Sequence, residues 1–376
     1  MNNLRKKLKG NRLITKMASV KIMVACLVWL FILTFWGTVA QVNQGLFLAQ
    51  KEFFHSWFFT IGGIIPLPGA QLIFWIMFFN LLCAAITHFI YKWSELGILI
   101  IHLGLLTYFA AAFVTFYNSQ ESNLTLAEGE GSNVSTDYHE WELSVWPDRQ
   151  SNINEIAAYD ASRLKNDTQL DFNELGFKVI VRSYFPNVQA YRTSLQMNTE
   201  TFFNSSGIQR LEPFPLNKEP EKNFPGGTFE IQTIDGQHFP LLLYGGETKA
   251  ASLKIGEKKY NFALRRKRYP LPFTLTLKDF TMAKHPGTDI ARSYQSKVII
   301  EHDGVSRDVL IYMNHPLRFK DFTLYQASYA IDSLGREFST LAVVKNAGRL
   351  LPYIAAAVTF AGLLIHFLIQ GLLKKI

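Results

Sequence analysis

Four long apolar stretches constrain this chain more than any other feature of its sequence. They cover residues 20–40, 72–91, 96–117 and 350–373. A helix needs about 20 residues to cross the hydrocarbon core of a bilayer, and each stretch reaches that length. The first is too long for a cleaved signal peptide and lacks a small-x-small cleavage site, so a membrane anchor is expected. The sequence therefore predicts an integral membrane protein with four transmembrane helices.

The distribution of charge predicts which segments lie on which side of the membrane. The formal net charge is +8, and six basic residues but no acidic ones precede residue 20. Lysines also occur in the short turn 92–95 and in the tail 374–376. Because Lys and Arg concentrate in cytoplasmic loops, the N-terminus (1–19), this turn and the tail are expected in the cytoplasm. The loop 41–71 and the region 118–349 are then expected outside.

The positive charge does not indicate a nucleic-acid-binding surface. Between residues 118 and 350 the chain has 27 Lys and Arg against 28 Asp and Glu, a formal net charge of −1. A nucleic-acid-binding domain would concentrate basic residues on one folded face. The positive excess instead flanks the apolar stretches, which excludes this class of function.

The outer region, residues 118–349, is expected to be a β-rich domain, mainly antiparallel. Runs typical of strands recur between turn residues, at Phe177–Val181, Thr228–Ile231, Phe273–Leu277, Lys297–Glu301 and Asp308–Tyr312. Both cysteines, Cys26 and Cys83, fall inside apolar stretches. Their position excludes an outer disulfide framework, a Cys-x-x-Cys redox motif and a haem-attachment motif in this chain.

Five further segments of the outer region carry specific expectations. Ile153–Arg163 could form a short helix, and Asn204–Gly227 is expected as a long loop. Glu128–Gly131 is expected to turn into the first strand. The basic run Arg265–Arg268 could contact anionic headgroups or haem propionates, or form a solvated turn. In Met313–Tyr329 a turn is expected at Asn314 and Pro316, and Phe322, Tyr325 and Tyr329 either provide stacking surfaces or pack in the core.

Three histidines lie in or at the edge of the apolar stretches: His88, His102 and His366. Ionisable side chains in membrane helices are rare and mark functional sites. At 1.5 Å per residue, His102 is expected about 10 Å and His366 about 12 Å from the cytoplasmic edge, and therefore at one depth. His88 is expected only about 6 Å from that edge. We therefore favour an interfacial role for His88 over a role as a haem ligand.

Two neutral imidazoles at one depth suit six-coordinate haem iron, because the porphyrin fills the other four positions. Small residues nearby are expected to leave room for the ring and aromatic ones to pack against it: Gly97, Gly104, Gly362, Phe109, Phe360 and Phe367. Interhelical hydrogen bonding and proton transfer are the alternative roles of the two histidines.

The outer histidines carry less information. His55, in the first outer loop, could approach haem or a substrate, or simply lie on the surface. The others lack the spacing of metal ligands, so no zinc or copper site is expected at His139, His238, His285, His302 or His315. No catalytic motif of a hydrolase or metalloprotease occurs either, and the sequence indicates a binding or carrier protein.

The order of three apolar helices, a long β-rich region and a closing helix resembles the ResB/CcsB family of cytochrome c biogenesis proteins. The local matches are Gly97–Leu105, Leu126–Gly129, Leu271–Phe280, His285–Ser296 and Tyr312–Tyr329. They extend along almost the whole chain, except around residues 185–265.

The resemblance implies a bacterial inner-membrane component of the System II machinery, which exports haem and attaches it to apocytochrome c. Both termini would be cytoplasmic and the large domain periplasmic. The chain would act as an accessory subunit of a cytochrome c synthase complex, without enzymatic activity of its own. Its partner would be a separate CcsA/ResC-type protein, because the tryptophan-rich haem-handling segment of such partners does not occur here. A third-helix histidine of the family is implicated in binding haem b, and His102 matches it. The partner would supply the opposing ligand, which would leave His366 spare or structural.

Two other classes of function remain open at this stage. A haem b electron-transfer subunit, passing electrons from quinol to an outer acceptor, would need both His102 and His366. A membrane scaffold without a cofactor would need neither.

Overall fold

The structure, a computed structural model, describes residues 11–87, 92–148, 157–192, 202–288 and 291–373. The chain divides into two compact units. The helical unit comprises Met1–Gln120, Arg318–Thr323 and Val344–Ile376, and the β unit comprises Glu121–Leu317 and Leu324–Val343.

In the described part of the helical unit, four helices are long and apolar enough to cross a membrane. They are α3 (Val20–Gln44), α5 (Ala70–Thr87), α6 (Leu96–Asn118) and α7 (Leu351–Leu373). The four predicted spans are therefore confirmed as helices, with ends that differ from the expected ones by at most four residues. For the second span this comparison stops at Thr87, because residues 88–91 lie outside the described part of the chain.

A buried amide fixes the start of α3. The short helix α2 (Arg12–Met17) ends just before α3, and Ser19 caps α3 by accepting a hydrogen bond from the Lys21 amide. Asn80 of α5, only 3% exposed, donates to the backbone carbonyls of Met17 and Ser19. A buried amide needs such partners, so Asn80 ties α5 to the α2–α3 junction.

The loop expected at residues 41–71 is folded. It contains α4 (Leu46–Ala49), a π-helical turn at Gln50–Phe54, and a hairpin of β1 (Phe58–Ile61) and β2 (Ile65–Pro68). Its aromatic side chains pack on α3: the Trp36 ring lies 5.8 Å from Phe53 and 5.7 Å from Phe59. Burial of these rings holds the segment against the helices.

The β unit contains two larger sheets. One has ten strands: β15, β14, β13, β4, β3, β18, β17 and β16 follow one another in this order, β12 pairs with β13, and β5 pairs with β4. The bounds of its strands are β3 (Gln120–Ala127), β4 (Gly131–Pro147), β5 (Ala157–Asp160), β12 (Ala251–Ile255), β13 (Lys258–Lys284), β14 (Ala291–His302), β15 (Val305–Tyr312), β16 (Leu317–Phe319), β17 (Phe322–Ile331) and β18 (Glu337–Lys345).

The second sheet has four strands in the order β11-β10-β7-β6. These are β6 (Gln169–Phe172), β7 (Phe177–Phe185), β10 (Gly226–Thr233) and β11 (His238–Tyr244), and a separate hairpin pairs β8 (Val188–Tyr191) with β9 (Arg210–Pro213). All pairings between these strands are antiparallel. The chain is therefore a membrane protein with a large, mostly antiparallel β domain, as the sequence predicts.

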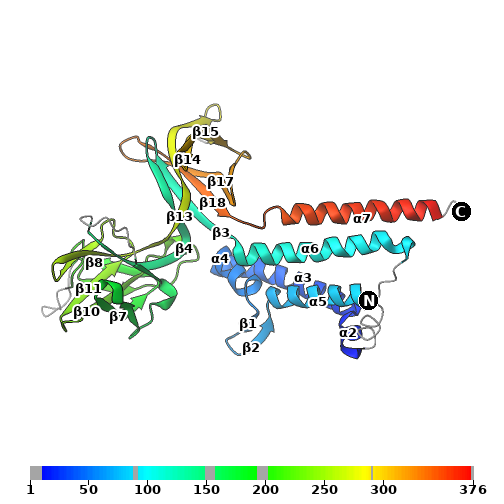
Figure 1. Ribbon diagram of the computed structural model, residues 1–376. Helices are drawn as coiled ribbons and strands as arrows, with labels where there is room; N and C mark the ends of the chain where they lie inside the picture. The colour runs from blue at the N-terminus through cyan, green and yellow to red at the C-terminus, as the bar shows by residue number, and fades with distance from the viewer. Residues whose placement is uncertain (1–10, 88–91, 149–156, 193–201, 289–290, 374–376) are drawn as a thin grey trace. The chain divides into compact units, whose positions relative to one another are not determined.

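The long strand β13 connects two parts of the β unit, the region that packs on the four-stranded sheet and the region that contains β14 and β15 (Figure 1). Its first half contributes Tyr260, Phe262 and Leu264 to the core shared with the four-stranded sheet, and its second half pairs with β14. Its pairing with β4 shifts between Arg266 and Arg268 and again between Pro270 and Leu275. A proline cannot donate to a strand ladder, so Pro270 and Pro272 account for the second shift.

The five predicted strand segments lie in β7, β10, β13, β14 and β15, and the turn at Glu128–Gly131 is also confirmed, with Gly129 at φ +79°. Three other expectations are wrong at least in part. Residues 157–160 form strand β5 where a short helix was expected, only Ala161–Arg163 form a 3-10 turn, and Ile153 lies outside the described residues. The expected loop Asn204–Gly227 contains β9 and the start of β10. For Arg265–Arg268 the solvated-turn alternative is wrong: the run lies within β13, and Arg265, Arg266 and Lys267 are only partly exposed.

The segment Met313–Tyr329 combines both expected roles. Asn314 adopts φ +65° in the turn between β15 and β16, as predicted. Phe322 is 8% exposed and packs in the interior, whereas Tyr325 is 44% exposed. The Tyr329 ring stacks on Phe280 at 5.6 Å. The aromatic residues of this segment therefore divide between packing and exposure.

Candidate functional site

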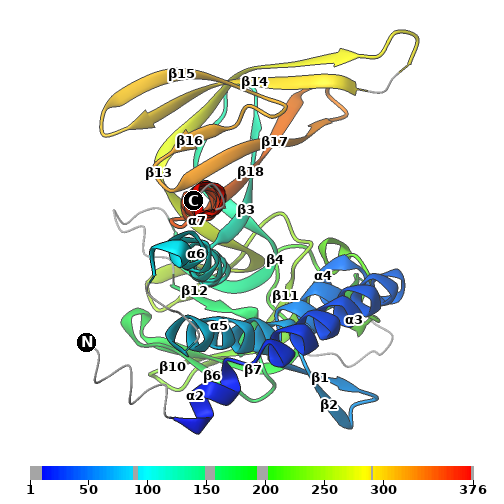
Figure 2. The ribbon, with the colours of Figure 1, turned by 90° about the vertical axis from the view of Figure 1, so that its right-hand side faces the viewer.

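Glycines bring α6 and α7 into direct contact, and the two helices lie side by side and antiparallel (Figures 1 and 2). A Cβ added to Gly97 would lie 2.5 Å from the Cα of His366, and one added to Gly362 would lie 2.7 Å from the Ile101 nitrogen. At Gly104 it would lie 2.8 Å from the Thr359 nitrogen. Small residues permit such close approach of membrane helices. The glycines therefore accommodate a neighbouring helix; they leave no room for a porphyrin between α6 and α7.

The register of this contact offsets His102 and His366 along the helix axes. Gly97 meets His366 and Gly104 meets Thr359, so His102 lies level with Ala361. His366 is five residues further along α7, or about 7.5 Å at 1.5 Å per residue. The expectation of equal depth is wrong because α7 continues to Leu373, past the level at which α6 begins.

The two histidines also lie on different sides of α6: His102 is part of that helix, and His366 belongs to α7, which packs against another face of it. Gly97 and Gly104 face α7, and His102 lies about 140° around the helix from Gly97 at 100° per residue. Phe109 follows His102 by seven residues and shares its face. This face meets α5, because the Phe109 ring lies 6.2 Å from Phe78. His102 therefore lies on the α5 side of α6, whereas His366 lies in the seam with α7.

The aromatic residues expected around a ring shared by α6 and α7 do not converge. Phe360 is 61% and Phe367 64% exposed, on the outside of α7. Phe109 packs near α5 with Phe113, whose ring stacks on Trp75 at a centroid distance of 4.0 Å. A haem ligated by both histidines of this chain does not fit this arrangement.

A single haem ligand on the His102 face does fit. The His102 Nδ1 lies 2.8 Å from the Ile98 carbonyl oxygen one turn earlier, and the side chain is half-buried. A carbonyl can only accept, so this bond requires the tautomer with hydrogen on Nδ1. The lone pair then lies on Nε2, the arrangement typical of metal-ligating histidines.

His366 has a different environment. Its Nδ1 is buried and has no hydrogen-bond partner among the described residues, and its ring makes an edge contact with Phe367 at 5.7 Å. His88, the third candidate, lies outside the described residues. His55 of the first outer loop contacts Phe116 of α6, with ring centroids 5.1 Å apart. Burial, and then the nearby charge of Lys51, lower the pKa of His55, which favours its neutral form.

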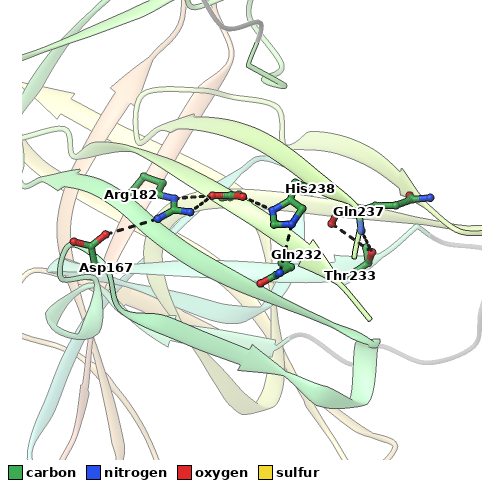
Figure 3. A network of polar contacts seen from close by, with 7 residues as sticks. Asp167, Arg182, Gln232, Thr233, Gln237 and His238 are labelled. Atoms are coloured by element: carbon green, nitrogen blue, oxygen red, sulfur yellow. Dashed lines mark hydrogen bonds and ion pairs between the residues drawn. The ribbon is translucent and has the colours of Figure 1, made fainter. Parts of the chain in front are cut away.

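A row of charged groups lies on the four-stranded sheet of the β unit (Figure 3). Arg182 donates through Nε to the Glu230 carboxylate at 2.6 Å, and the other oxygen of that carboxylate pairs with His238. Asp167 lies 3.8 Å from the Arg182 guanidinium. Arg182 and Glu230 are 48 positions apart, so the sequence alone gives no signal for this network. His238, which lacks metal-ligand spacing, has a structural partner here.

Replacing Glu230 by glutamine is expected to lower the free energy of unfolding at neutral pH by about 1 kcal/mol or less, because the half-exposed Arg182 is screened by solvent. Hydrogen bonds from Arg182 and then His238 hold the pKa of Glu230 below its ordinary 4.5. Such a carboxylate stabilises the fold above its unfolded-state pKa, and this contribution is lost as pH falls through the folded-state value. Unfolding measured from pH 7 down to pH 3 should show the two proteins converging as the pH falls below the ordinary Glu pKa of 4.5.

The matched control for this prediction is Asp167→Asn. Asp167 is 83% exposed and only loosely paired, so this variant should follow the wild type at every pH. A gap between Glu230→Gln and wild type that widens on acidification would contradict the assigned role of Glu230.

The remaining outer histidines have separate surroundings. His139 Nδ1 lies 3.5 Å from Glu221, His302 Nδ1 lies 2.6 Å from the Pro272 carbonyl oxygen, and His315 stacks on Tyr312 at 4.0 Å. Among the residues that the structure describes, no three His, Cys, Asp or Glu side chains gather in a way that could hold a metal ion.

Four apolar helices and a large antiparallel β domain define a membrane protein with a β-rich extramembrane part. Within that class, residues 242–337 match the ResB-like family. The matched residues run from β11 to the first residue of β18, across the longest strand of the domain. This match confirms the resemblance to the ResB/CcsB family that the sequence features indicate.

A curated relative is Protein NrfI of Wolinella succinogenes. It is 29% identical to this chain over 119 residues, which are 31% of this chain and 13% of NrfI. The chain therefore spans only a small part of the length of that relative.

Proposed function

We propose that this protein belongs to the machinery that matures c-type cytochromes, binding haem in the membrane and acting with a CcsA/ResC-type partner to deliver it to apocytochrome c. The family match supports the pathway. The observation that carries the haem proposal is the orientation of His102, with Nδ1 bonded to the Ile98 carbonyl and the lone pair on Nε2. In this proposal haem is cargo, and the chain is an accessory subunit.

The geometry supports one haem ligand from this chain and a second from the partner. His366 is offset from His102 by about 7.5 Å and lies in the α6–α7 seam. A partner helix approaching the His102 face of α6 could present an imidazole to the opposite side of the haem iron. The Ile98 carbonyl orients the His102 ring, and the aromatic cluster of α5 and α6 excludes water from this face.

The orientation in the membrane is part of the same proposal. The basic residues before α3 and between α5 and α6 favour the cytoplasm for these segments, and they flank helices that alternate in direction. The β unit then lies on the periplasmic side of a bacterial inner membrane, where it can meet apocytochrome c or support the partner.

The test is the absorption spectrum of the full-length protein copurified with a CcsA/ResC-type partner. We expect a reduced b-type haem band that falls at least tenfold in His102→Ala and persists in His366→Leu. The second variant is the matched control, because it removes an imidazole at a neighbouring depth whose Nδ1 makes no hydrogen bond to any residue that the structure describes. Added imidazole should restore the band of His102→Ala by replacing the missing ligand.

Two other outcomes would redirect the assignment. Loss of the band in both variants, from this chain purified alone, would support an electron-transfer subunit with two internal ligands. A band that is unchanged in His102→Ala would refute the haem role of His102, and absence of any band would leave a scaffold as the function.

A further inference from the structure

The β unit contains a hollow of about 640 Å³ where β4 and β13 meet the connection between β11 and β12. This volume is within the range of small-molecule sites. Four aromatic side chains form much of its wall: Trp141, Trp146, Phe224 and Tyr244. Trp141 and Phe224 touch edge to face at 6.0 Å. The wall therefore provides apolar, planar surfaces around a concave space.

The charged residues that line the hollow are mainly basic. Four are cationic and two are anionic: Lys249, Arg265, Arg266, Arg268, Glu221 and Glu247. The β unit as a whole has 23 Lys and Arg against 27 Asp and Glu, a formal net charge of −4. The positive charge of the hollow is thus a local feature, and it favours an anion inside.

The arginines differ in how far their charge is already satisfied. Arg265 donates through Nε to Glu142 at 2.9 Å, and both side chains are nearly buried. Within the described part of the chain, Arg266 donates through Nη2 to the Glu221 carbonyl at 3.0 Å, and its Nη1 is buried without a partner. Among the described residues, Arg268 makes no ion pair. Arg266 and Arg268 therefore retain capacity for an acceptor.

The tryptophans hold the guanidinium groups in place. The Arg266 guanidinium lies 4.2 Å from the centre of the Trp141 ring, and that of Arg265 lies 5.2 Å from Trp146. Such contacts fix the plane of a guanidinium, whose fork then matches a carboxylate with two parallel bonds. Burial lowers the pKa of Arg266, and the carboxylates of Asp137 and Glu221 offset only part of that effect, so a further anion at its unpaired Nη1 would be favourable.

We propose that this hollow binds a planar apolar ligand that carries carboxylates, with the carboxylates on Arg266 and Arg268 and the ring against the aromatic wall. The identity of the ligand rests on the proposed function: it is haem, held on the outer side by its propionates after leaving the His102 face. A lipid headgroup would fit less well, because the site is concave and walled by aromatic rings.

The test uses metal-free protoporphyrin IX and the full-length protein in lipid nanodiscs, with binding followed by porphyrin fluorescence. Arg266→Ala should weaken binding roughly tenfold, the effect of losing one charge-assisted contact. Arg307→Ala is the matched control: it removes an equal charge from the exposed part of β15, and it should bind as the wild type does. Equal affinity of the two variants would refute the site.

Further variants separate the site from overall folding and from the membrane haem. Arg268→Ala alters an exposed side chain and should also weaken binding, whereas Arg266→Lys should restore only part of the affinity because it lacks the fork. Protoporphyrin dimethyl ester should bind weakly and without dependence on Arg266; tight binding of the ester would overturn the carboxylate assignment. Without iron there is no axial ligation, so His102→Ala should leave this binding intact even if the proposed function of His102 fails.

Discussion

Gly97→Leu is expected to separate α6 from α7 and to lower the stability of the helical unit by about 3 kcal/mol or more, the upper range for overpacking. The added side chain would begin 2.5 Å from the Cα of His366, and a backbone atom cannot move aside by changing rotamer. The helices would have to part along the whole seam that Gly97, Gly104 and Gly362 form. The measurement is the thermal unfolding midpoint of the full-length protein in mild detergent, with limited proteolysis to detect release of α7.

Gly371→Leu provides the matched control for Gly97→Leu. Gly371 lies within α7, and among the described residues no atom lies within 4 Å of the position that its Cβ would occupy. This variant should unfold at or above the wild-type midpoint, because leucine favours helix more than glycine does. Equal midpoints for the two leucine variants would mean that the seam at Gly97 is not closely packed.

Most of the fold follows from the pattern of the sequence. Membrane helices need long apolar runs, and these set α3, α5, α6 and α7 within a few residues. Alternating runs such as Phe273–Leu277 identify single strands. The local pattern does not predict the order of strands in the sheets, because strands far apart in the sequence pair with each other: β4 pairs with β13, more than 100 positions away. Such pairings depend on tertiary packing, which no local signal records.

The sequence was sufficient to identify the candidate histidines of the site, but it did not predict their relative positions. The rarity of histidine in membrane helices identifies His102 and His366. Counting depth from flanking charges fails, because α7 extends past the start of α6. The glycines suggested space for a porphyrin ring, but they accommodate α7, and this role is evident only when the position of the neighbouring helix is known. The seven-residue spacing of Gly97, Gly104 and Ala111 does indicate one feature of the geometry. These small residues share one face of α6, and His102 is not on that face.

The outer hollow shows a different limit of sequence reasoning. Arg265–Arg268 stands out as a basic run, but Trp141 and Trp146 do not, because aromatic residues are frequent throughout this chain. Only the register of β4 against β13 sets Trp141 opposite Arg266 and Glu142 opposite Arg265. The cross-strand pair of Glu142 and Arg265 is also the basis of the second large prediction.

Glu142→Ala is expected to cost the β unit about 3 kcal/mol or more of unfolding free energy, as for other buried ion pairs that lose one partner. The Glu142 side chain is 7% and that of Arg265 14% exposed, and their contact is 2.9 Å. Without Glu142 the guanidinium would be nearly buried beside Arg266 and Arg268, with no carboxylate to offset it. Denaturant unfolding followed by tryptophan fluorescence reports on this region directly, through Trp141 and Trp146.

Glu140→Ala tests whether burial, more than charge, sets the size of the Glu142 effect. Glu140 lies on the same strand and pairs with Lys267 at 3.6 Å, but it is 62% exposed, so its loss should cost less than about 1 kcal/mol. The double variant Glu142→Ala, Arg265→Ala should recover part of the stability that Glu142→Ala loses, because it also removes the stranded charge. A loss for Glu142→Ala no larger than that for Glu140→Ala would show that water reaches Arg265. The arginine side chains would then be solvated, and their electrostatic attraction for an anion in the hollow would be weaker.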